Sequence, residues 1–332
     1  MPKISIKDIA KYANVSPSTV SRALQGHPRI SEETKLKIRD IAKQYNYIPN
    51  QIARALKTKE TKTIGLIISD ITNPFYTEIT KGVEDACVIK GYSVILCNSD
   101  FNLERESSYL KVLTEKGVDG IILTPHSVNH LHDYFFDINH IPYVLVDIKP
   151  INPNVNCVYA DQEEGALIAT KFLIEKGHRK ITFLNGPVKL PSANQAIKGY
   201  KRAFNEFGLK INKDSIIETP QKIERAYLIT KQLLKKNDNL TAIFSLSDMM
   251  CIGIYQAIYE EQLRIPDDIA VVGYDDLPVT RFMDPPLTTV YQPKYEVGNL
   301  AAELLINQIK AGSSWSPRTI KLSTRLVVRK ST

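Results

Sequence analysis

Acidic side chains stand at the ends of several short apolar runs in the second part of the chain. Asp147 ends the run that begins at Tyr143, Asp275 follows the run 269–273, and Asp161 occupies a similar position. Carboxylates accept hydrogen bonds from hydroxyl groups, and Phe75 offers an aromatic face that packs against the apolar side of a ring. This set of residues is typical of a pocket that binds a small, hydroxyl-rich molecule.

A different group of polar residues lies near the N-terminus, within residues 17–24. The helical period places Val20, Ala23 and Leu24 on one face of this segment and short polar residues on the other. Serine and threonine hydroxyls hydrogen-bond to base edges, and an arginine pairs with guanine through two hydrogen bonds. The exposed face therefore predicts reading of DNA sequence by Ser18, Thr19, Ser21 and Arg22.

Local signals predict short helices around this face. The capping box Ser5-x-x-Asp8 opens a first helix, and Asn14 tolerates the left-handed conformation that a tight turn needs. Ser16 caps the second helix, with Pro17 at its first position, where a missing N–H costs nothing. Because this helix would enter the DNA major groove, its capping end is expected to lie at the contact.

A third helix is expected after a cap at Ser31, and it should end near Tyr45. Its inward residues are expected to be Leu36, Ile38, Ile41 and Ala42. Three short helices with a tight turn between the first two predict a helix-turn-helix. Phosphate contacts that position the protein without reading sequence are expected from Lys3, Arg29, Lys35 and Lys37.

The charge distribution supports DNA binding by this segment. The chain carries +7, and residues 1–62 alone hold thirteen Lys and Arg against five Asp and Glu. The excess positive charge is thus confined to a small module attached to a nearly neutral body, which is the electrostatic pattern of a nucleic-acid-binding domain. The alternative, a solvated basic tail, does not account for the regular apolar spacing.

The rest of the chain alternates strand and helix patterns. A helix is expected over 75–90, and buried strands are expected at 63–68, 92–97, 120–123, 143–147, 180–184, 242–246 and 269–273. This rhythm predicts parallel, doubly wound sheets, and its restart after residues 161–165 predicts two lobes with a cleft between them. Ligands of such sheets bind at the carboxyl ends of the strands.

The motifs resemble those of the lactose/galactose repressor family of bacterial transcriptional regulators. In the N-terminal segment the resemblance rests on 8–10, 15–16, 19–22 and 47–50, and in the core on 73–75, 118–120, 177–179, 265–268, 273–276 and 286–290. It implies an N-terminal all-α helix-turn-helix headpiece and an α/β core of two doubly wound lobes, similar to periplasmic binding proteins. The expected boundaries are 1–49 for the headpiece, 50–61 for a hinge and 62–332 for the core. Within the core we expect one lobe at about 62–160 plus 291–320 and the other at about 161–290 plus 321–332.

The resemblance also implies roles for individual residues. Asn50 caps a hinge helix, in which Leu56 is the residue that wedges between base steps and Ala53 lets the two hinges of a dimer approach. Effector-contacting positions are implied for Phe75, Tyr76, Asp147, Asp161, Ser192, Ser247 and Asp275. Two departures stand out, since Ala196 replaces an arginine common in sugar-responsive relatives and Ser247 stands where relatives often have asparagine.

These observations favour a repressor of a carbohydrate-utilisation operon that binds palindromic operator DNA and is switched by a sugar-like effector. No hydrolase, zinc-protease or nucleotide-binding motif points to an enzyme or a cofactor. The alternatives are a regulator that responds to a non-sugar metabolite and one that binds a protein corepressor. We expect a cytoplasmic homodimer without a membrane segment, because no long apolar run and no leucine heptads are present.

Overall fold

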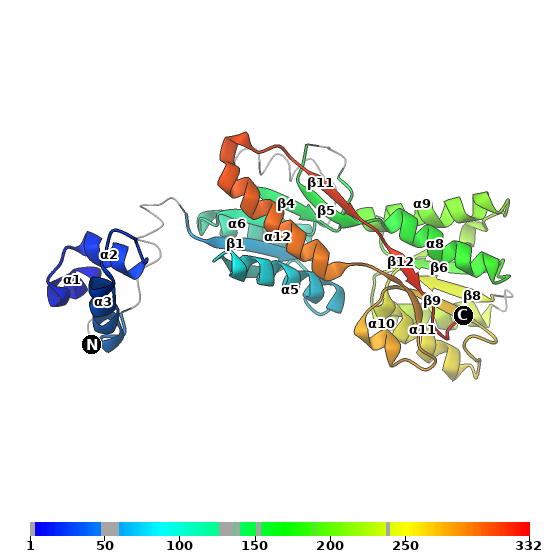
Figure 1. Cartoon of the computed structure of the whole chain (residues 1–332). Helices are drawn as coiled ribbons and strands as arrows, with labels where there is room; N and C mark the ends of the chain where they lie inside the picture. The colour runs from blue at the N-terminus through cyan, green and yellow to red at the C-terminus, as the bar shows by residue number, and fades with distance from the viewer. Residues whose placement is uncertain are drawn as a thin grey trace. The chain divides into compact units, whose positions relative to one another are not determined.

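The computed structural model describes residues 4–47, 60–125, 136, 140–150, 154–188, 190–236 and 240–332. The chain divides into two compact units, residues 1–61 and 62–332. Each unit has its own apolar core, so each is described separately (Figure 1).

Within residues 4–47 the first unit has three helices: α1 (Ile6–Ala13), α2 (Pro17–Leu24) and α3 (Glu32–Gln44). Asn14 ends α1 in the left-handed conformation, with φ of 56°, so the turn to α2 forms as the sequence predicts. Ile9, Val20, Ala23 and Ile38 are fully buried and form the centre of a small core. This arrangement confirms the predicted three-helix unit.

The second unit contains two six-stranded sheets. The first has the strand order β11-β5-β4-β3-β1-β2, and all of its strands pair in parallel. Its strands are β1 (Thr63–Ile68), β2 (Ser93–Asn98), β3 (Gly120–Leu123), β4 (Tyr143–Val146), β5 (Cys157–Ala160) and β11 (Thr319–Leu322).

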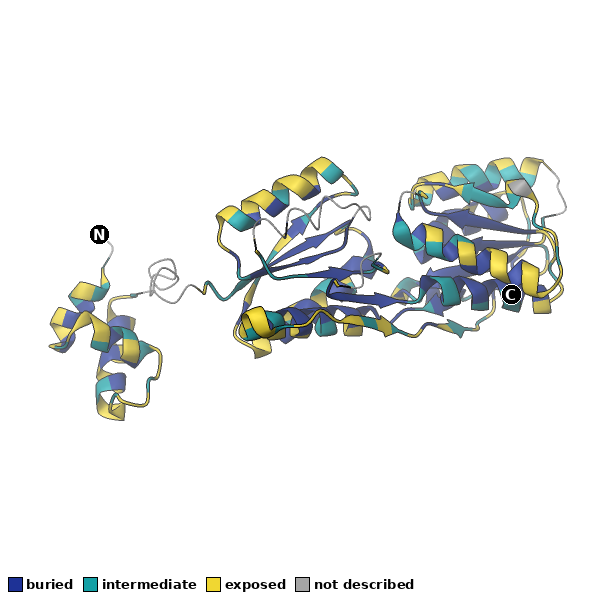
Figure 2. Cartoon of the chain, turned by 90° about the horizontal axis from the view of Figure 1, so that it is seen from above, coloured by how far each residue is buried: buried dark blue, intermediate teal, exposed yellow. Residues whose placement is uncertain are grey.

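The second sheet has the order β12-β10-β9-β8-β6-β7. Its strands pair in parallel except β12, which runs antiparallel to β10. Its strands are β6 (Ile181–Asn185), β7 (Ile216–Glu218), β8 (Ala242–Ser245), β9 (Ala270–Asp275), β10 (Thr288–Tyr291) and β12 (Arg325–Val327). Each sheet is the centre of one lobe, and its inner strands are buried between outer layers of helices (Figure 2).

Helices cover both sheets, as parallel sheets require. The first lobe has α5 (Pro74–Ile89), α6 (Leu103–Glu115) and α12 (Lys294–Ala311), and the second has α8 (Gln162–Glu175), α9 (Pro191–Glu206), α10 (Ile223–Lys235) and α11 (Asp248–Glu260). Helices α5 and α12 lie side by side (Figure 1). Their contact needs glycine, because a Cβ on Gly82 would lie 2.1 Å from the Tyr295 carbonyl oxygen and one on Gly298 would lie 2.0 Å from that of Ile79.

The chain crosses between the lobes at three places. The crossings lie between β5 and α8, between β10 and α12, and between β11 and β12. The expected lobe boundary at residue 320 falls inside β11, which pairs with β5 of the first sheet through Leu322. The third crossing therefore lies a few residues later than the sequence suggested. Within the described part of the chain, no helix has the length and apolar character needed to span a bilayer.

Candidate functional site

The helix expected to read DNA begins with a well-formed cap. Ser16 Oγ accepts a hydrogen bond from the Thr19 backbone N–H at 3.1 Å, and the hydroxyls of Ser18 and Thr19 lie 2.8 and 2.9 Å away. Pro17 occupies the first helical position. The Ser16 side chain thus satisfies a backbone donor that the helix itself leaves unpaired, and this cap fixes the start of α2.

The outward face of α2 is accessible, as base contact requires. Pro17, Ser18 and Arg22 are exposed, whereas Thr19 and Ser21 are half-buried. Arg22 forms no ion pair with any residue that the structure describes, so its guanidinium is available to an outside partner. The assignment of base contacts to these residues stays a prediction.

Two expectations for α3 are wrong. Lys35, expected at a phosphate, is only 6% exposed, and its Nζ donates to Glu32 Oε1 at 2.7 Å. Leu36, expected inward, is 57% exposed. The buried face instead follows Lys35, Ile38 and Ala42, because the aliphatic stem of the lysine covers the core while its ammonium reaches the edge.

The remaining expected DNA contacts divide into two groups. Arg29 is exposed in the loop between α2 and α3, where its backbone N–H donates to His27 Nδ1 at 3.2 Å. Asn50, Ala53 and Leu56, the expected hinge contacts, lie outside the described residues, as does Lys3.

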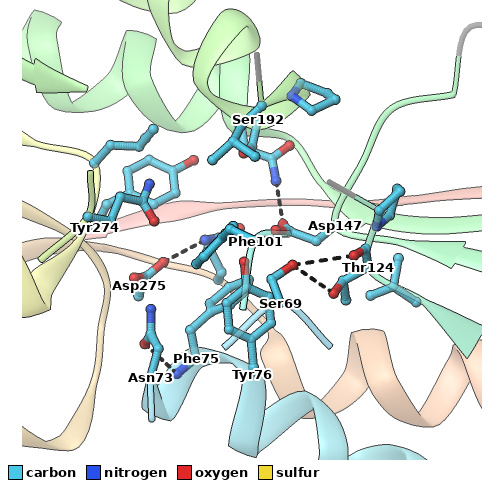
Figure 3. Close-up of a pocket in the computed structure, with 18 residues that line it drawn as sticks. Ser69, Asn73, Phe75, Tyr76, Phe101, Thr124, Asp147, Ser192, Tyr274 and Asp275 are labelled. Atoms are coloured by element: carbon cyan, nitrogen blue, oxygen red, sulfur yellow. Dashed lines mark hydrogen bonds between the residues drawn. The ribbon is translucent and has the colours of Figure 1, made fainter. Parts of the chain in front are cut away.

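A pocket lies between the two lobes of the core, at the carboxyl ends of their strands (Figure 3). It contains about 610 Å³ of empty space, part of which is open solvent. The wall combines nine polar side chains with the aromatic rings of Phe75, Tyr76, Phe101 and Tyr274.

Five of the seven expected effector residues line this pocket. Phe75, Tyr76 and Asp147 come from the first lobe, and Ser192 and Asp275 come from the second. Figure 3 shows Asp147 and Asp275 on opposite sides of the pocket. Residues more than 180 positions apart in the sequence therefore meet at one site.

Asp161 and Ser247 are not among the residues that line this pocket, and their expected contact with the effector stays a prediction. Asp161 caps α8 by accepting from the Glu164 N–H at 3.1 Å, and its other oxygen pairs with Lys321 Nζ at 3.0 Å. Ser247 is 1% exposed and begins α11 behind the pocket wall, to which its neighbour Leu246 contributes. Strand-end position alone did not distinguish these residues from the true lining.

Asp147 presents a carboxyl group from the first lobe. It follows β4 with φ of 62°, and its Oδ1 accepts from Gln162 Nε2 at 2.8 Å. Burial raises the pKa of Asp147 to about 7, and the hydrogen bond from Gln162 opposes this rise. The group can therefore exchange a proton near neutral pH.

Asp275 presents the matching carboxyl group from the second lobe. Its Oδ1 accepts from Gln292 Nε2 at 2.8 Å, and its backbone oxygen accepts from Lys294 Nζ at 2.5 Å. Burial, reinforced by the nearby Asp248, raises the pKa of Asp275 well above its usual range. Its φ of 115° is an uncommon backbone conformation that turns the chain at the end of β9.

The start of α5 supplies the aromatic side of the pocket. Asn73 caps this helix by accepting from the Phe75 N–H at 3.0 Å, and this cap places the two following rings at the wall. Phe75 and Tyr76 pack edge to face with centroids 5.0 Å apart, and Phe101 adds a third ring 6.2 Å from Tyr76. The rings offer faces to a flat or ring-shaped ligand.

The described lining of the pocket has hydrogen-bond acceptors but no cationic side chain. None of the described residues that line it is a lysine or an arginine. Among its buried atoms, the Tyr274 hydroxyl and Gln292 Oε1 have no hydrogen-bond partner within the described chain. Ala196, which was expected to replace an arginine, is fully buried in the core of the second lobe. The lining therefore suits a ligand with hydroxyl or N–H donors better than an anion.

Sequence reasoning missed several lining residues. Ser69 and Thr124 follow β1 and β3, so the carboxyl-end rule could have found them. No local pattern marks the three glutamines Gln162, Gln221 and Gln292, which come from a helix start, a loop and a crossing.

Comparison with known proteins agrees with both units. A family described as bacterial regulatory proteins, lacI family, matches residues 5–50, and one described as periplasmic binding proteins and sugar binding domain of LacI family matches residues 61–330. A relative from Photobacterium profundum named HTH-type transcriptional repressor PurR is 35% identical, over 98% of each chain. A relative of the same name from Histophilus somni is 36% identical, also over 98% of each chain.

Solved structures are similar over nearly the whole chain. The Lac repressor dimer bound to operator and the anti-inducer ONPF has a TM-score of 0.89 at 26% identity and covers 99% of this chain and 98% of its own. A complex of the transcriptional regulator CelR with cellobiose has a TM-score of 0.76 at 28% identity, covering 99% and 100%. A LacI family regulator from Enterococcus faecium with bound ribose has a TM-score of 0.74 at 30% identity, covering 81% and 98%.

The helix-turn-helix with its accessible second helix, the two-lobed core and these matches agree with one another. The relatives are transcriptional repressors, which confirms the expectation that the chain is not an enzyme. The chain belongs to the LacI family of bacterial DNA-binding transcriptional repressors.

Proposed function

We propose that this repressor changes its affinity for operator DNA when a small, neutral, hydroxyl-rich molecule binds between the lobes, and that this molecule is a sugar or sugar derivative. The observation that carries the proposal is the pocket itself. It presents Asp147 and Asp275 from opposite lobes, offers aromatic faces, and has no lysine or arginine among its described lining residues.

The chemistry of a sugar matches this lining. Ring hydroxyls donate to the two carboxyl groups, and the apolar face of a sugar ring packs against an aromatic side chain such as Phe75. Among the described lining residues, a phosphate group would meet two carboxyl groups and no lysine or arginine, so anionic effectors fit this lining badly. Two of the similar structures are complexes with cellobiose and with ribose.

The switch follows from the position of the pocket. A ligand that contacts both lobes favours one arrangement of them over another, and such differential binding changes operator affinity by about 1–3 kcal/mol in typical allosteric proteins. We infer that the chain acts as a cytoplasmic homodimer on a palindromic operator of a carbohydrate-utilisation operon. In this proposal, residues 1–49 bind the major groove, 50–61 form the hinge and 62–332 form the sensing core.

On the DNA side, we propose that the capping end of α2, Ser16 and Pro17, lies at the major groove. The outward side chains Ser18, Thr19, Ser21 and Arg22 would then reach base edges, and Arg29 would contact a phosphate. Asn50, Ala53 and Leu56 would form the minor-groove contact.

A flat nucleobase is the second candidate effector. Four aromatic side chains line the pocket, and they would stack on a heterocycle as well as on a sugar. The two classes differ in hydroxyl content, so they are separable by experiment.

A thermal-shift screen of the full chain tests the proposal. The panel contains neutral mono- and disaccharides, sugar phosphates, and purine and pyrimidine bases. A ligand present at 100 times its Kd should stabilise the folded core by about 2.7 kcal/mol and raise its Tm. A neutral sugar should be among the binders; a response only to sugar phosphates or bases would overturn the assignment.

A further inference from the structure

The carboxyl group of Asp147 is held by a residue of the opposite lobe. Asp147 follows β4 in the first sheet, whereas Gln162 is the first residue of α8, which packs on α9 and on the second sheet. The distance from Gln162 Nε2 to Asp147 Oδ1 is 2.8 Å, and Gln162 is only 3% exposed. A hydrogen bond between the buried Gln162 and the half-buried Asp147 thus joins the two lobes at the pocket wall.

The residue before Gln162 is fixed to another crossing. The Asp161 N–H donates to the Leu322 carbonyl oxygen at 3.1 Å, and Lys321 Nζ lies 3.0 Å from Asp161 Oδ2. The Thr324 hydroxyl also donates to the Asp161 carbonyl oxygen at 3.4 Å. Two of the three crossings are therefore tied together at Asp161, so Gln162 changes its position relative to Asp147 only when the connection between the lobes moves.

The hydrogen bond also determines what Asp147 offers to a ligand. With Oδ1 engaged by Gln162, Oδ2 is the oxygen available to the pocket. A hydrogen bond donated to a carboxylate favours its charged form and so opposes the effect of burial. An ionised Asp147 accepts from a ligand hydroxyl, whereas a protonated one is itself a donor.

We propose that Gln162 is a positioning residue that keeps Asp147 ready to accept a ligand hydroxyl and transmits the occupancy of Asp147 to the connection between the lobes. This inference rests on the proposed function, in that the ligand is taken to donate a hydroxyl hydrogen bond in this pocket. A ligand bound to Asp147 changes the acceptor strength of the carboxyl group that holds Gln162. The bond to Gln162 then differs between the free and occupied states, and the lobe arrangement differs with it.

Few other groups near Asp147 titrate around neutral pH. Tyr76 faces it from α5, Cys157 from β5, and Tyr274 and Asp275 from β9. Burial raises the pKa of Tyr76, Cys157 and Tyr274 further above neutrality, so these three groups stay uncharged. Asp275 is the remaining neighbour; burial raises its pKa well above the usual range, and the residue is unaltered in the variants below.

The test compares Gln162→Leu, which keeps the size of the side chain and removes its donor, with Gln162→Glu, which places a second acidic group against Asp147. Gln256→Leu is the matched control, because Gln256 also donates one hydrogen bond to a carboxylate, that of Glu260, but on the exposed face of α11. Two measurements are made on the full chain without any ligand. The first is the titration of the Asp147 side chain by carbon-13 NMR, and the second is the affinity for a palindromic operator duplex by fluorescence anisotropy.

Both Gln162 variants should raise the titration midpoint of Asp147 and change the ligand-free operator affinity by about threefold to tenfold, as expected for the net contribution of one ordinary hydrogen bond. In an Asp147→Leu background, Gln162→Leu should have no further effect on operator affinity, because the acceptor is already absent. Gln256→Leu should leave both measurements at their wild-type values.

Unchanged titration and unchanged operator affinity in both Gln162 variants would overturn the inference, as would an equal effect of Gln162→Leu with and without Asp147. Neither measurement contains a sugar, so their outcome is separate from that of the proposed function. If the wild-type chain bound no neutral sugar in the thermal-shift screen, the proposed effector would be wrong even if Gln162 controlled the titration of Asp147.

Discussion

Replacement of Asp275 by asparagine should weaken effector binding without lowering the stability of the empty core. Asparagine has almost the same shape and keeps an oxygen that accepts from Gln292 Nε2, which now lies 2.8 Å from Asp275 Oδ1. It also tolerates unusual backbone conformations, as the φ of 115° at this position requires. The bond from Lys294 Nζ goes to the backbone oxygen and does not depend on the side chain.

The expected magnitudes follow from these contacts. A hydrogen bond between a ligand hydroxyl and the Asp275 carboxyl group contributes about 0.5–1.5 kcal/mol, so its loss should weaken effector binding by about 2- to 12-fold. Stability of the empty core should not fall, because Asp275 is buried and its raised pKa shows that the folded core disfavours its charge. Removing that charge relieves an unfavourable contribution at neutral pH.

Calorimetry with the sugar found in the thermal-shift screen measures the sugar affinity of wild type and Asp275→Asn. The Tm of both proteins without ligand measures the stability of the empty core. Asp275→Ala is the contrasting variant, because it leaves the buried amide of Gln292 without its acceptor and should lower Tm. Equal sugar affinity of wild type and Asp275→Asn would refute the role of Asp275. A large fall in Tm for Asp275→Asn would refute the account of its packing.

Three further outcomes are expected. Arg22→Ala should weaken operator binding by about 1–3 kcal/mol and relax the base preference at one operator position. Arg29→Ala should weaken binding to all duplexes alike and reduce the salt dependence of binding. If both variants had equal effects across operator variants, the assignment of Arg22 to a base and Arg29 to a phosphate would be contradicted. Lys35→Met should leave operator affinity unchanged in the same anisotropy assay, because Lys35 is buried and paired with Glu32. Burial raises the pKa of Asp147 from its usual value of 3.8 to about 7 in the folded state. Protonation of Asp147 therefore stabilises the folded state at low pH, and this contribution is lost as the pH rises from about 4 to 7. The fall in Tm over this range should be shallower in Asp147→Asn, and identical slopes would contradict the raised pKa.

The headpiece was predictable because its signals are local. Ser16 accepts from a backbone N–H three residues away, and Asn14 takes up the left-handed conformation within the turn itself. The errors on α3 arose where apolarity was used as a measure of burial. Leu36 is exposed while the aliphatic stem of Lys35 covers the core, and a pattern of apolar residues does not predict that a lysine is buried in place of a leucine.

The core was predictable where a strand is a long apolar run. β1 and β9 have this character. β5 and β10 are short buried strands and β7, β11 and β12 are short and partly exposed, and none of these five was predicted. Some of them depend on partners that are distant in the chain or at a sheet edge, such as the pairing of β11 with β5. Pairing of this kind leaves little trace in local sequence.

The pocket residues also divide into those that the local sequence predicts and those that it does not. Asp147 and Asp275 were predictable because strand ends of a parallel sheet converge. Asp161 occupies a similar position but turns to cap α8 and to pair with Lys321, a contact made across 160 positions of sequence. Gln162, its neighbour, enters the pocket instead, and nothing in the local sequence marks the difference.

The most direct test of the account is the operator affinity of the full chain, measured by fluorescence anisotropy with and without a saturating pocket ligand. The duplex is a palindrome selected from a random library, and the ligand is a neutral sugar from the thermal-shift screen. If the pocket controls DNA binding, the sugar should change the wild-type Kd for operator by about 5- to 150-fold. At the same sugar concentration, the change in the operator Kd of Asp275→Asn should be much smaller. An operator Kd that stays the same when the sugar is fully bound would contradict the claim that this pocket controls DNA binding.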